Sequence, residues 1–191
     1  MVSVFDIFKI GIGPSSSHTV GPMKAGKQFA DDLIAAGLLE KTTRIQVDVY
    51  GSLSLTGKGH ATDIAIIMGL AGNLPDSVDI DAIPGFIRDV EERERLLLAN
   101  QRHEVDFPRD NGMNFHKENL PLHENGMSIS AFSGDELLYK KTYYSIGGGF
   151  SWMKSILVRL RTAKPKCLIR ISMPLICKNT VTKPGCLCLR W

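Results

Sequence analysis

The spacing of apolar residues along the chain predicts both strands and helices. Residues 44–51 alternate between apolar and polar side chains, which is the pattern of a half-buried strand. Residues 22–39 place apolar side chains at helical spacing, and Gly37 stands where that helix would end. Residues 64–71 are apolar nearly all round and predict a helix at the centre of the core, whereas residues 83–94 predict a more exposed helix with a charged, solvated face.

The second half of the folded body has the pattern of paired strands. Residues 96–99 and 103–107 flank a short polar turn and predict one hairpin, and residues 126–133 and 136–145 predict a second hairpin around Ser133-Gly134-Asp135. A weaker strand is expected at residues 113–116. Since helices and hairpins are mixed without strict β-α alternation, we expect an α+β fold with helices packed on a mainly antiparallel sheet.

The C-terminal part of the sequence departs from this pattern. Residues 151–191 contain nine Lys or Arg residues and no Asp or Glu. All four cysteines lie there, and their spacing matches no Cys-x₂-Cys pair, so a metal site is not favoured. We therefore divide the chain into a body, residues 1–150, and a basic tail, residues 151–191, which is expected to be disordered or frameshifted. These four cysteines are Cys167, Cys177, Cys186 and Cys188.

Composition excludes several functional classes. The 191 residues suffice for one domain with a core, and no apolar run reaches the roughly 18 residues that span a bilayer. The net charge of +3 comes from the tail, because the body alone is acidic, so nothing in the body favours nucleic-acid binding. Residues 1–12 fit a short strand or a helical turn and lack the basic start of a signal peptide, which leads us to expect a cytoplasmic protein.

A hydroxyl-rich loop precedes the first predicted helix. Residues 11–22 read Gly-Ile-Gly-Pro-Ser-Ser-Ser-His-Thr-Val-Gly-Pro, in which glycine and proline mark a tight turn and Pro22 suits the first turn of a helix. Ser17, Thr19 or Gly21 would then lie near the N-cap, where hydroxyls and free N–H groups can bind a carboxylate or phosphate. The alternative is a well-capped helix preceded by a polar loop.

Three histidines lie in glycine-bearing loops, where functional residues are common: His18, His60 and His123. Each could instead be structural, and no two histidines have the i, i+3 or i, i+4 spacing of a zinc site. Thr56-Gly57-Lys58-Gly59 is not a P-loop, because a serine stands at position 52 and a glycine follows the lysine. A sharper role for this turn is to hold His60 at a helix N-terminus, where the dipole favours the neutral imidazole.

Four segments together resemble the N-terminal β domain of the iron–sulfur-dependent bacterial L-serine dehydratases: residues 5–19, 50–60, 123–127 and 143–150. The resemblance covers residues 1–150. It implies a fold like an allosteric substrate-binding domain and the conversion of L-serine to pyruvate and ammonia, a step in amino-acid degradation and gluconeogenesis. It also implies a [4Fe–4S] cluster as Lewis acid, without pyridoxal phosphate.

The resemblance also suggests roles for particular residues. His60 is the candidate base, and His18, His123 and Asn125 are polar partners at the same site. Four residues would contact the substrate carboxylate or shape the loop: Ser15, Ser16, Ser17 and Thr19. No metal ligand is assigned in this chain, because the family's cluster cysteines belong to a second, helical domain.

The departures from the family define the expected state of this chain. We expect the family's helical domain to be missing after residue 150, because the tail resembles translation in a shifted reading frame followed by an early stop. We therefore expect a truncated dehydratase without iron–sulfur colour or activity alone, whose partners are L-serine, the missing helical domain and, in a homodimer, a second copy. The alternatives are a small-anion or serine-binding regulatory module and a histidine-based metal hydrolase.

Overall fold

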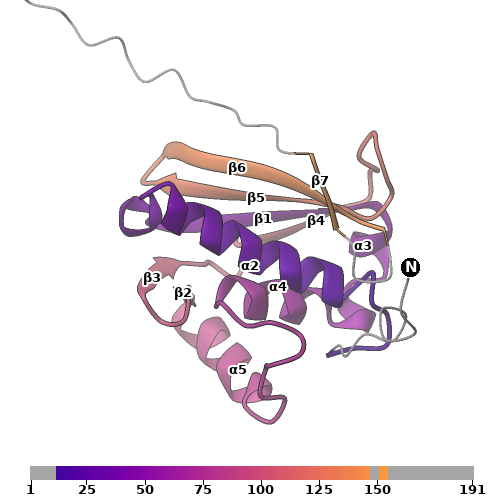
Figure 1. Cartoon of the computed structure of the whole chain (residues 1–191), viewed down its shortest axis with the longest axis horizontal. Coiled ribbons are helices and arrows are strands. Elements are labelled where there is room, and N and C mark those ends of the chain that lie inside the picture. Colours follow the sequence, from indigo (N-terminus) through magenta and orange to yellow (C-terminus); the bar gives the residue numbers. More distant parts are fainter. Residues whose placement is uncertain (1–11, 147–150, 155–191) are drawn as a thin grey trace, which may run out of the picture. The chain divides into compact units, whose positions relative to one another are not determined.

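The computed structural model describes residues 12–146 and 151–154 (Figure 1). The helical segments are α2 (Val20–Ala35), η1 (Leu39–Lys41), α3 (Gly51–Leu55), η2 (Lys58–His60), α4 (Thr62–Leu70) and α5 (Ile83–Arg93). The strands are β1 (Arg44–Tyr50), β2 (Arg95–Leu98), β3 (His103–Asp106), β4 (Met113–His116), β5 (Gly126–Ser133), β6 (Glu136–Ser145) and β7 (Ser151–Lys154).

The strands form one mixed sheet in the order β2-β3-β1-β5-β6-β7, and β4 pairs with β1. The hairpins β2–β3 and β5–β6 are antiparallel, as the sequence predicts. β1 is antiparallel to β5 but parallel to both β3 and β4. The predicted α+β class is therefore confirmed, and the sheet is mainly antiparallel with two parallel pairings on one side of β1.

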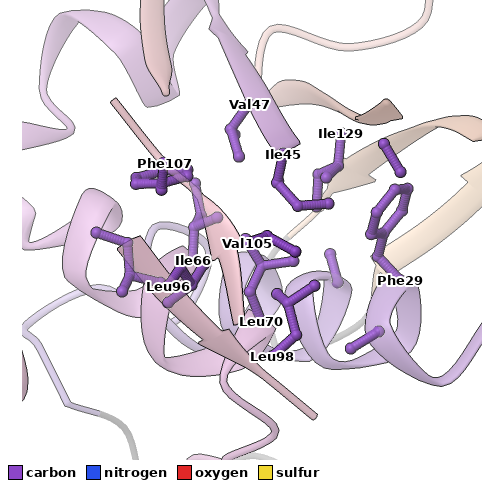
Figure 2. Close-up of a cluster of buried hydrophobic side chains, with 14 of the residues drawn as sticks. Phe29, Ile45, Val47, Ile66, Leu70, Leu96, Leu98, Val105, Phe107 and Ile129 are labelled. Carbon is purple, nitrogen blue, oxygen red and sulfur yellow. The ribbon is translucent and has the colours of Figure 1, made fainter. Parts of the chain in front are cut away.

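Helices cover one face of this sheet, and the apolar core lies between the two layers. Figure 1 shows α2 and α4 lying together along that face. The alternation in β1 sends Ile45, Val47 and Val49 into the core, where none of them is exposed. They meet Phe29 from α2 and Ile66 from α4 (Figure 2). Burial of these side chains contributes about 1.5–3 kcal/mol each, so the helix–sheet contact dominates the stability of the domain.

A buried ion pair also connects α2 to the sheet. Lys141 of β6 donates to the Asp32 carboxylate of α2, and the side chain of Lys141 is 9% exposed. The Tyr139 hydroxyl donates to the same carboxylate at 3.3 Å. Since a charge buried in this way needs its partner, the pair fixes how α2 lies along β6.

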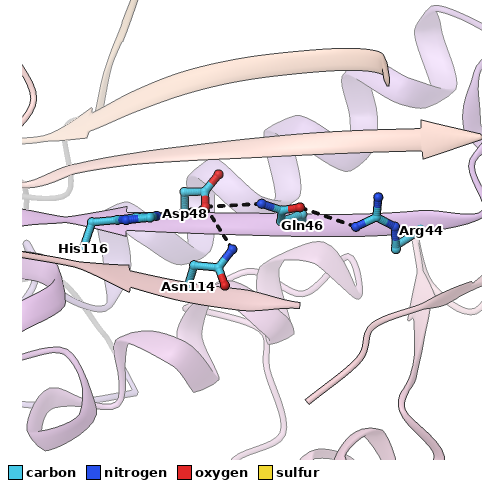
Figure 3. A network of polar contacts seen from close by, with 5 residues as sticks. All are labelled: Arg44, Gln46, Asp48, Asn114 and His116. Atoms are coloured by element: carbon cyan, nitrogen blue, oxygen red, sulfur yellow. Dashed lines mark hydrogen bonds and ion pairs between the residues drawn. The ribbon is translucent and has the colours of Figure 1, made fainter. Parts of the chain in front are cut away.

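The opposite face of the sheet is polar. Figure 3 shows Asp48 on β1 with Gln46 beside it on the same strand and Asn114 and His116 on β4. Asp48 Oδ1 accepts hydrogen bonds from Asn114 Nδ2 at 3.1 Å and from His116 Nε2 at 3.0 Å. Burial alone would raise the pKa of Asp48, but the bonds from His116, Asn114 and Gln46 outweigh it and leave the pKa below its usual value. The network ties the ends of β1 and β4 together.

The main differences from the expected boundaries are three, and the other elements shift by one or two residues. α2 runs from Val20 to Ala35 rather than over 22–39, and it ends with Gly37 N–H bonded to Ile34 O and Leu38 N–H bonded to Leu33 O. The segment predicted as a single turn contains α3 and η2. Strand β7 lies beyond the predicted boundary at residue 150 and pairs with β6.

Some expectations fall on residues that the structure does not describe. These are most of the N-terminal segment, the glycines at 147–149 and the tail from 155 with its four cysteines. Within the described residues, no helix is both long and apolar enough to cross a membrane.

Candidate functional site

The serine loop folds around the carbonyl of Ser15. This oxygen accepts the backbone N–H of His18 at 3.2 Å and both the N–H and the hydroxyl of Thr19, at 3.0 and 2.7 Å. Thr19 occupies the N-cap position of α2, as predicted, but its hydroxyl donates to Ser15 O and does not cap the helix. The loop is therefore closed on itself, and its Ser15 and Ser17 hydroxyls are left to contact other groups.

Those hydroxyls surround the ring of His18. Nδ1 lies 3.2 Å from Ser15 Oγ and 3.0 Å from Ser17 Oγ, and Nε2 lies 3.4 Å from Ser52 Oγ at the start of α3. Burial, followed by the neighbouring His60 ring, lowers the pKa of His18 below its usual value. The ring is therefore neutral near pH 7 and can act as a hydrogen-bond donor and acceptor.

His60 lies beside His18, although the two are far apart in the sequence. Their ring centroids are 5.0 Å apart and the planes are tilted by 38°. His60 Nδ1 is 2.9 Å from the Thr56 carbonyl oxygen, and a left-handed Ala61 separates the histidine from the first residue of α4. The predicted position of His60 just before a helix is therefore confirmed.

The loop between β4 and β5 lies near α3, at the end of the sheet where β1 ends (Figure 1). Ser52 N–H donates to Glu124 O at 3.0 Å, and Gly51 N–H donates to Glu118 O at 2.9 Å. Gly51 has φ +56°, and a Cβ there would overlap the Glu124 carbonyl oxygen, so this close approach needs glycine. The backbone after β1 thus holds the loop that carries His123.

Ser145, at the end of β6, joins this loop to the serine loop. Its hydroxyl donates to Ser17 O at 2.6 Å, and its N–H donates to Asn125 O at 2.9 Å. Asn125 N–H in turn donates to His123 Nδ1 at 3.0 Å. Asn125 is 7% exposed, and its buried Oδ1 has no hydrogen-bond partner among the residues that the structure describes.

The structure therefore brings Ser15, Ser17, His18 and His60 into direct proximity. Thr19 and Ser16 shape the loop through the backbone, since Ser16 O accepts the Gly21 N–H at 3.1 Å. His123 and Asn125 belong to a loop joined to this site by Ser52 and Ser145. These two serines were not singled out from the sequence. Their signals are their place within segments 50–60 and 143–150, which carry the family resemblance, and their position directly after a strand or at its end, where functional loops begin.

The described residues do not fit an iron–sulfur cluster. Such clusters are held by cysteine thiolates, and residues 12–146 and 151–154 contain no cysteine. Nor does this part of the chain hold any group of three or more His, Cys, Asp or Glu side chains placed to bind a metal ion. The site instead offers hydroxyls and the neutral imidazole of His18, a set suited to a small polar ligand with an anionic group.

The fold and the site together define a class of protein: an α+β domain that carries a histidine pair, lined by hydroxyls, at the end of its sheet. The family model of the serine dehydratase beta chain matches residues 3–155. L-serine dehydratase 1 of Escherichia coli is 80% identical over 150 residues, which are 78% of this chain and 33% of that relative. The L-serine dehydratases of Haemophilus influenzae and Streptomyces coelicolor are 62% and 45% identical, over 78% of this chain and 33% of each relative. The chain belongs to the serine dehydratase beta chain family, and it spans about a third of the length of these curated relatives.

Proposed function

We propose that this chain supplies one half of an L-serine dehydratase active site. The observation that carries the proposal is the His18–His60 pair, with ring centroids 5.0 Å apart and with Ser15, Ser17 and Ser52 hydroxyls on the His18 ring. The names of the relatives give the reaction, and the family match gives the part of the enzyme that this chain represents.

The proposed chemistry assigns binding and proton transfer to these side chains. The hydroxyls of the serine loop hold the substrate carboxylate. His60 removes the α-proton and returns it to the 3-hydroxyl, which leaves as water. The resulting aminoacrylate becomes an imine, which water hydrolyses to pyruvate and ammonia. The lowered pKa of His18 keeps this neighbour uncharged, so it does not repel a proton that His60 accepts.

The iron–sulfur cluster belongs in this proposal to the helical domain that the resemblance implies, where it would supply Lewis-acid chemistry. The partners are accordingly L-serine and that helical domain, and the assembly acts in the cytoplasm as a homodimer. The described residues of this chain contribute the hydroxyls and imidazoles only.

Reconstitution tests this proposal. The helical domain of the 80%-identical relative is produced separately, loaded with its cluster and mixed with this chain, and pyruvate formation from L-serine is measured. The proposal expects turnover in the mixture and none from either part alone. A mixture that forms a complex but yields no pyruvate would overturn it.

A regulatory module that binds serine or another small anion is the second candidate. The hydroxyl-rich loop before α2 favours it, because this loop could bind a carboxylate without any partner. Calorimetric titration of the chain with L-serine separates the two. Binding by the isolated chain without turnover in the reconstituted mixture supports the module, whereas turnover in the mixture supports the enzyme.

A further inference from the structure

Two histidines of this chain differ in the backbone group that is hydrogen-bonded to their Nδ1 atom. His60 Nδ1 is 2.9 Å from the carbonyl oxygen of Thr56, and a carbonyl can only accept a hydrogen bond. His123 Nδ1 is 3.0 Å from the backbone nitrogen of Asn125, and a backbone N–H can only donate. The first contact requires a hydrogen on Nδ1, and the second requires a lone pair there.

We infer that His60 and His123 are held in opposite neutral tautomers, so that His60 presents an accepting Nε2 and His123 presents a donating Nε2–H. Each assignment follows from a backbone partner whose polarity cannot change. His18 differs, because serine hydroxyls contact both of its ring nitrogens and a hydroxyl can either donate or accept. The tautomer of His18 is therefore free to follow its neighbours.

His103 provides an internal standard for this inference. Its Nε2 lies 2.7 Å from the Thr42 carbonyl oxygen, which fixes a hydrogen on Nε2. His103 contacts Thr42, which lies just before the start of β1. His60 lies beyond the C-terminal end of β1, after α3. The strand of seven residues separates them by about 20 Å. His103 should thus share the tautomer of His123 and differ from His60, independently of any ligand.

Opposite tautomers suit a zwitterionic amino acid, and this use of them rests on the proposed function. The α-hydrogen of such a ligand needs an acceptor, which His60 Nε2 supplies as the proposed base. Its carboxylate needs donors, which His123 Nε2–H supplies alongside the serine loop. Had both rings the same tautomer, one of these two groups would face a nitrogen of the wrong polarity.

The size of the preference follows from one hydrogen bond. The alternative tautomer of His60 would face the Thr56 carbonyl with a lone pair and lose the bond at 2.9 Å. One ordinary hydrogen bond shifts such an equilibrium by about fivefold. We therefore expect each of the two rings to be roughly 85% in its assigned tautomer when neutral.

The test is a long-range ¹H–¹⁵N correlation spectrum of the full 191-residue chain, labelled at histidine nitrogens and recorded at a pH where the rings are neutral. His60 should show a protonated Nδ1 and an unprotonated Nε2, whereas His123 and His103 should show the reverse. Resonances are assigned by their loss in His60→Gln or His60→Asn and in His123→Gln or His123→Asn. Unchanged His103 shifts identify the variants that keep the native fold.

Two results overturn the inference: the same tautomer in His60 and His123, or nitrogen shifts of either ring that are averaged between the tautomers. Addition of L-serine to the reconstituted mixture tests the proposed function separately. Opposite tautomers, together with a mixture that forms a complex but yields no pyruvate, uphold the inference and count against the proposed function. Pyruvate formation in the reconstituted mixture with averaged tautomers upholds the function and defeats the inference.

Discussion

Replacement of Gly21 by alanine tests the contact that holds the serine loop against the sheet. Gly21 is the second residue of α2 and is buried. A Cβ at this position would lie 2.9 Å from Ser145 Cβ and closer still to Ser145 Oγ. The Ser145 hydroxyl is the group that donates to Ser17 O, and its N–H holds Asn125 O. The added methyl must therefore displace the side chain that bonds the serine loop, in a residue whose backbone N–H bonds the loop of Asn125.

The cost can be estimated from these contacts. Overpacking in a rigid site costs about 1–3 kcal/mol, and loss of the Ser145–Ser17 hydrogen bond adds about 1 kcal/mol. Alanine is a better helix former than glycine by about 1 kcal/mol, which offsets part of this cost. We expect Gly21→Ala to lower the free energy of unfolding by about 1–3 kcal/mol. Gly85, near the start of α5, is the matched control, because a Cβ there meets nothing within 4 Å.

A double-mutant cycle with Ser145→Gly isolates the contact. Glycine at 145 removes both atoms that the new methyl would strike and leaves Ser145 Cα at an ordinary 3.8 Å. The double variant should therefore be more stable than the sum of the single changes predicts, by at least about 1 kcal/mol. Urea unfolding followed by circular dichroism measures all four proteins, with Gly85→Ala expected to be neutral or stabilising. Additive effects within about 0.5 kcal/mol, or a Gly21→Ala variant that matches Gly85→Ala, would refute the reasoning.

Three further predictions concern stability. Tyr143→Phe should unfold at a urea concentration equal to or above that of the parent, because the buried Tyr143 hydroxyl has no hydrogen-bond partner within the described part of the chain; a loss above about 1 kcal/mol contradicts this. The lowered pKa of Asp48 means that its contribution to stability is present above its ordinary pKa and is lost as the pH falls through the folded value. As the pH falls below about 4, the urea midpoint of Asp48→Asn should therefore decrease less steeply than that of the parent. Parallel plots of midpoint against pH would count against this role of Asp48. Gly51→Ala should destabilise the domain by about 1–3 kcal/mol in urea unfolding, since φ is +56° and the methyl would overlap Glu124 O; an unchanged midpoint contradicts the proposed close approach.

The sequence predicts most regular elements correctly because their signals are local. The alternation at Ile45, Val47 and Val49 identifies β1, and the turn around Gly134 identifies the hairpin of β5 and β6. α3 was missed, because five residues are too short to display a helical period. The parallel pairing of β1 with β3 and β4 is a property of the tertiary fold, and no local pattern encodes it.

The candidate site shows the same division. The serine loop and the position of His60 before a helix are local, and both are correct. The contact of His18 with Ser52 and that of Ser17 with Ser145 depend on how β1 and β6 end at the same edge of the sheet. Only the structure supplies these contacts. The catalytic and substrate-binding roles of the predicted residues remain predictions.

Turnover by the reconstituted enzyme with a substituted histidine tests the central claim most directly. His60→Gln and the matched control His103→Gln are each combined with the cluster-loaded helical domain, and kcat for pyruvate formation from L-serine is measured. If the histidine pair is half of the active site, His60→Gln lowers kcat by about 10²–10⁴-fold while His103→Gln stays near the parent value. Near-normal kcat for His60→Gln would contradict the account.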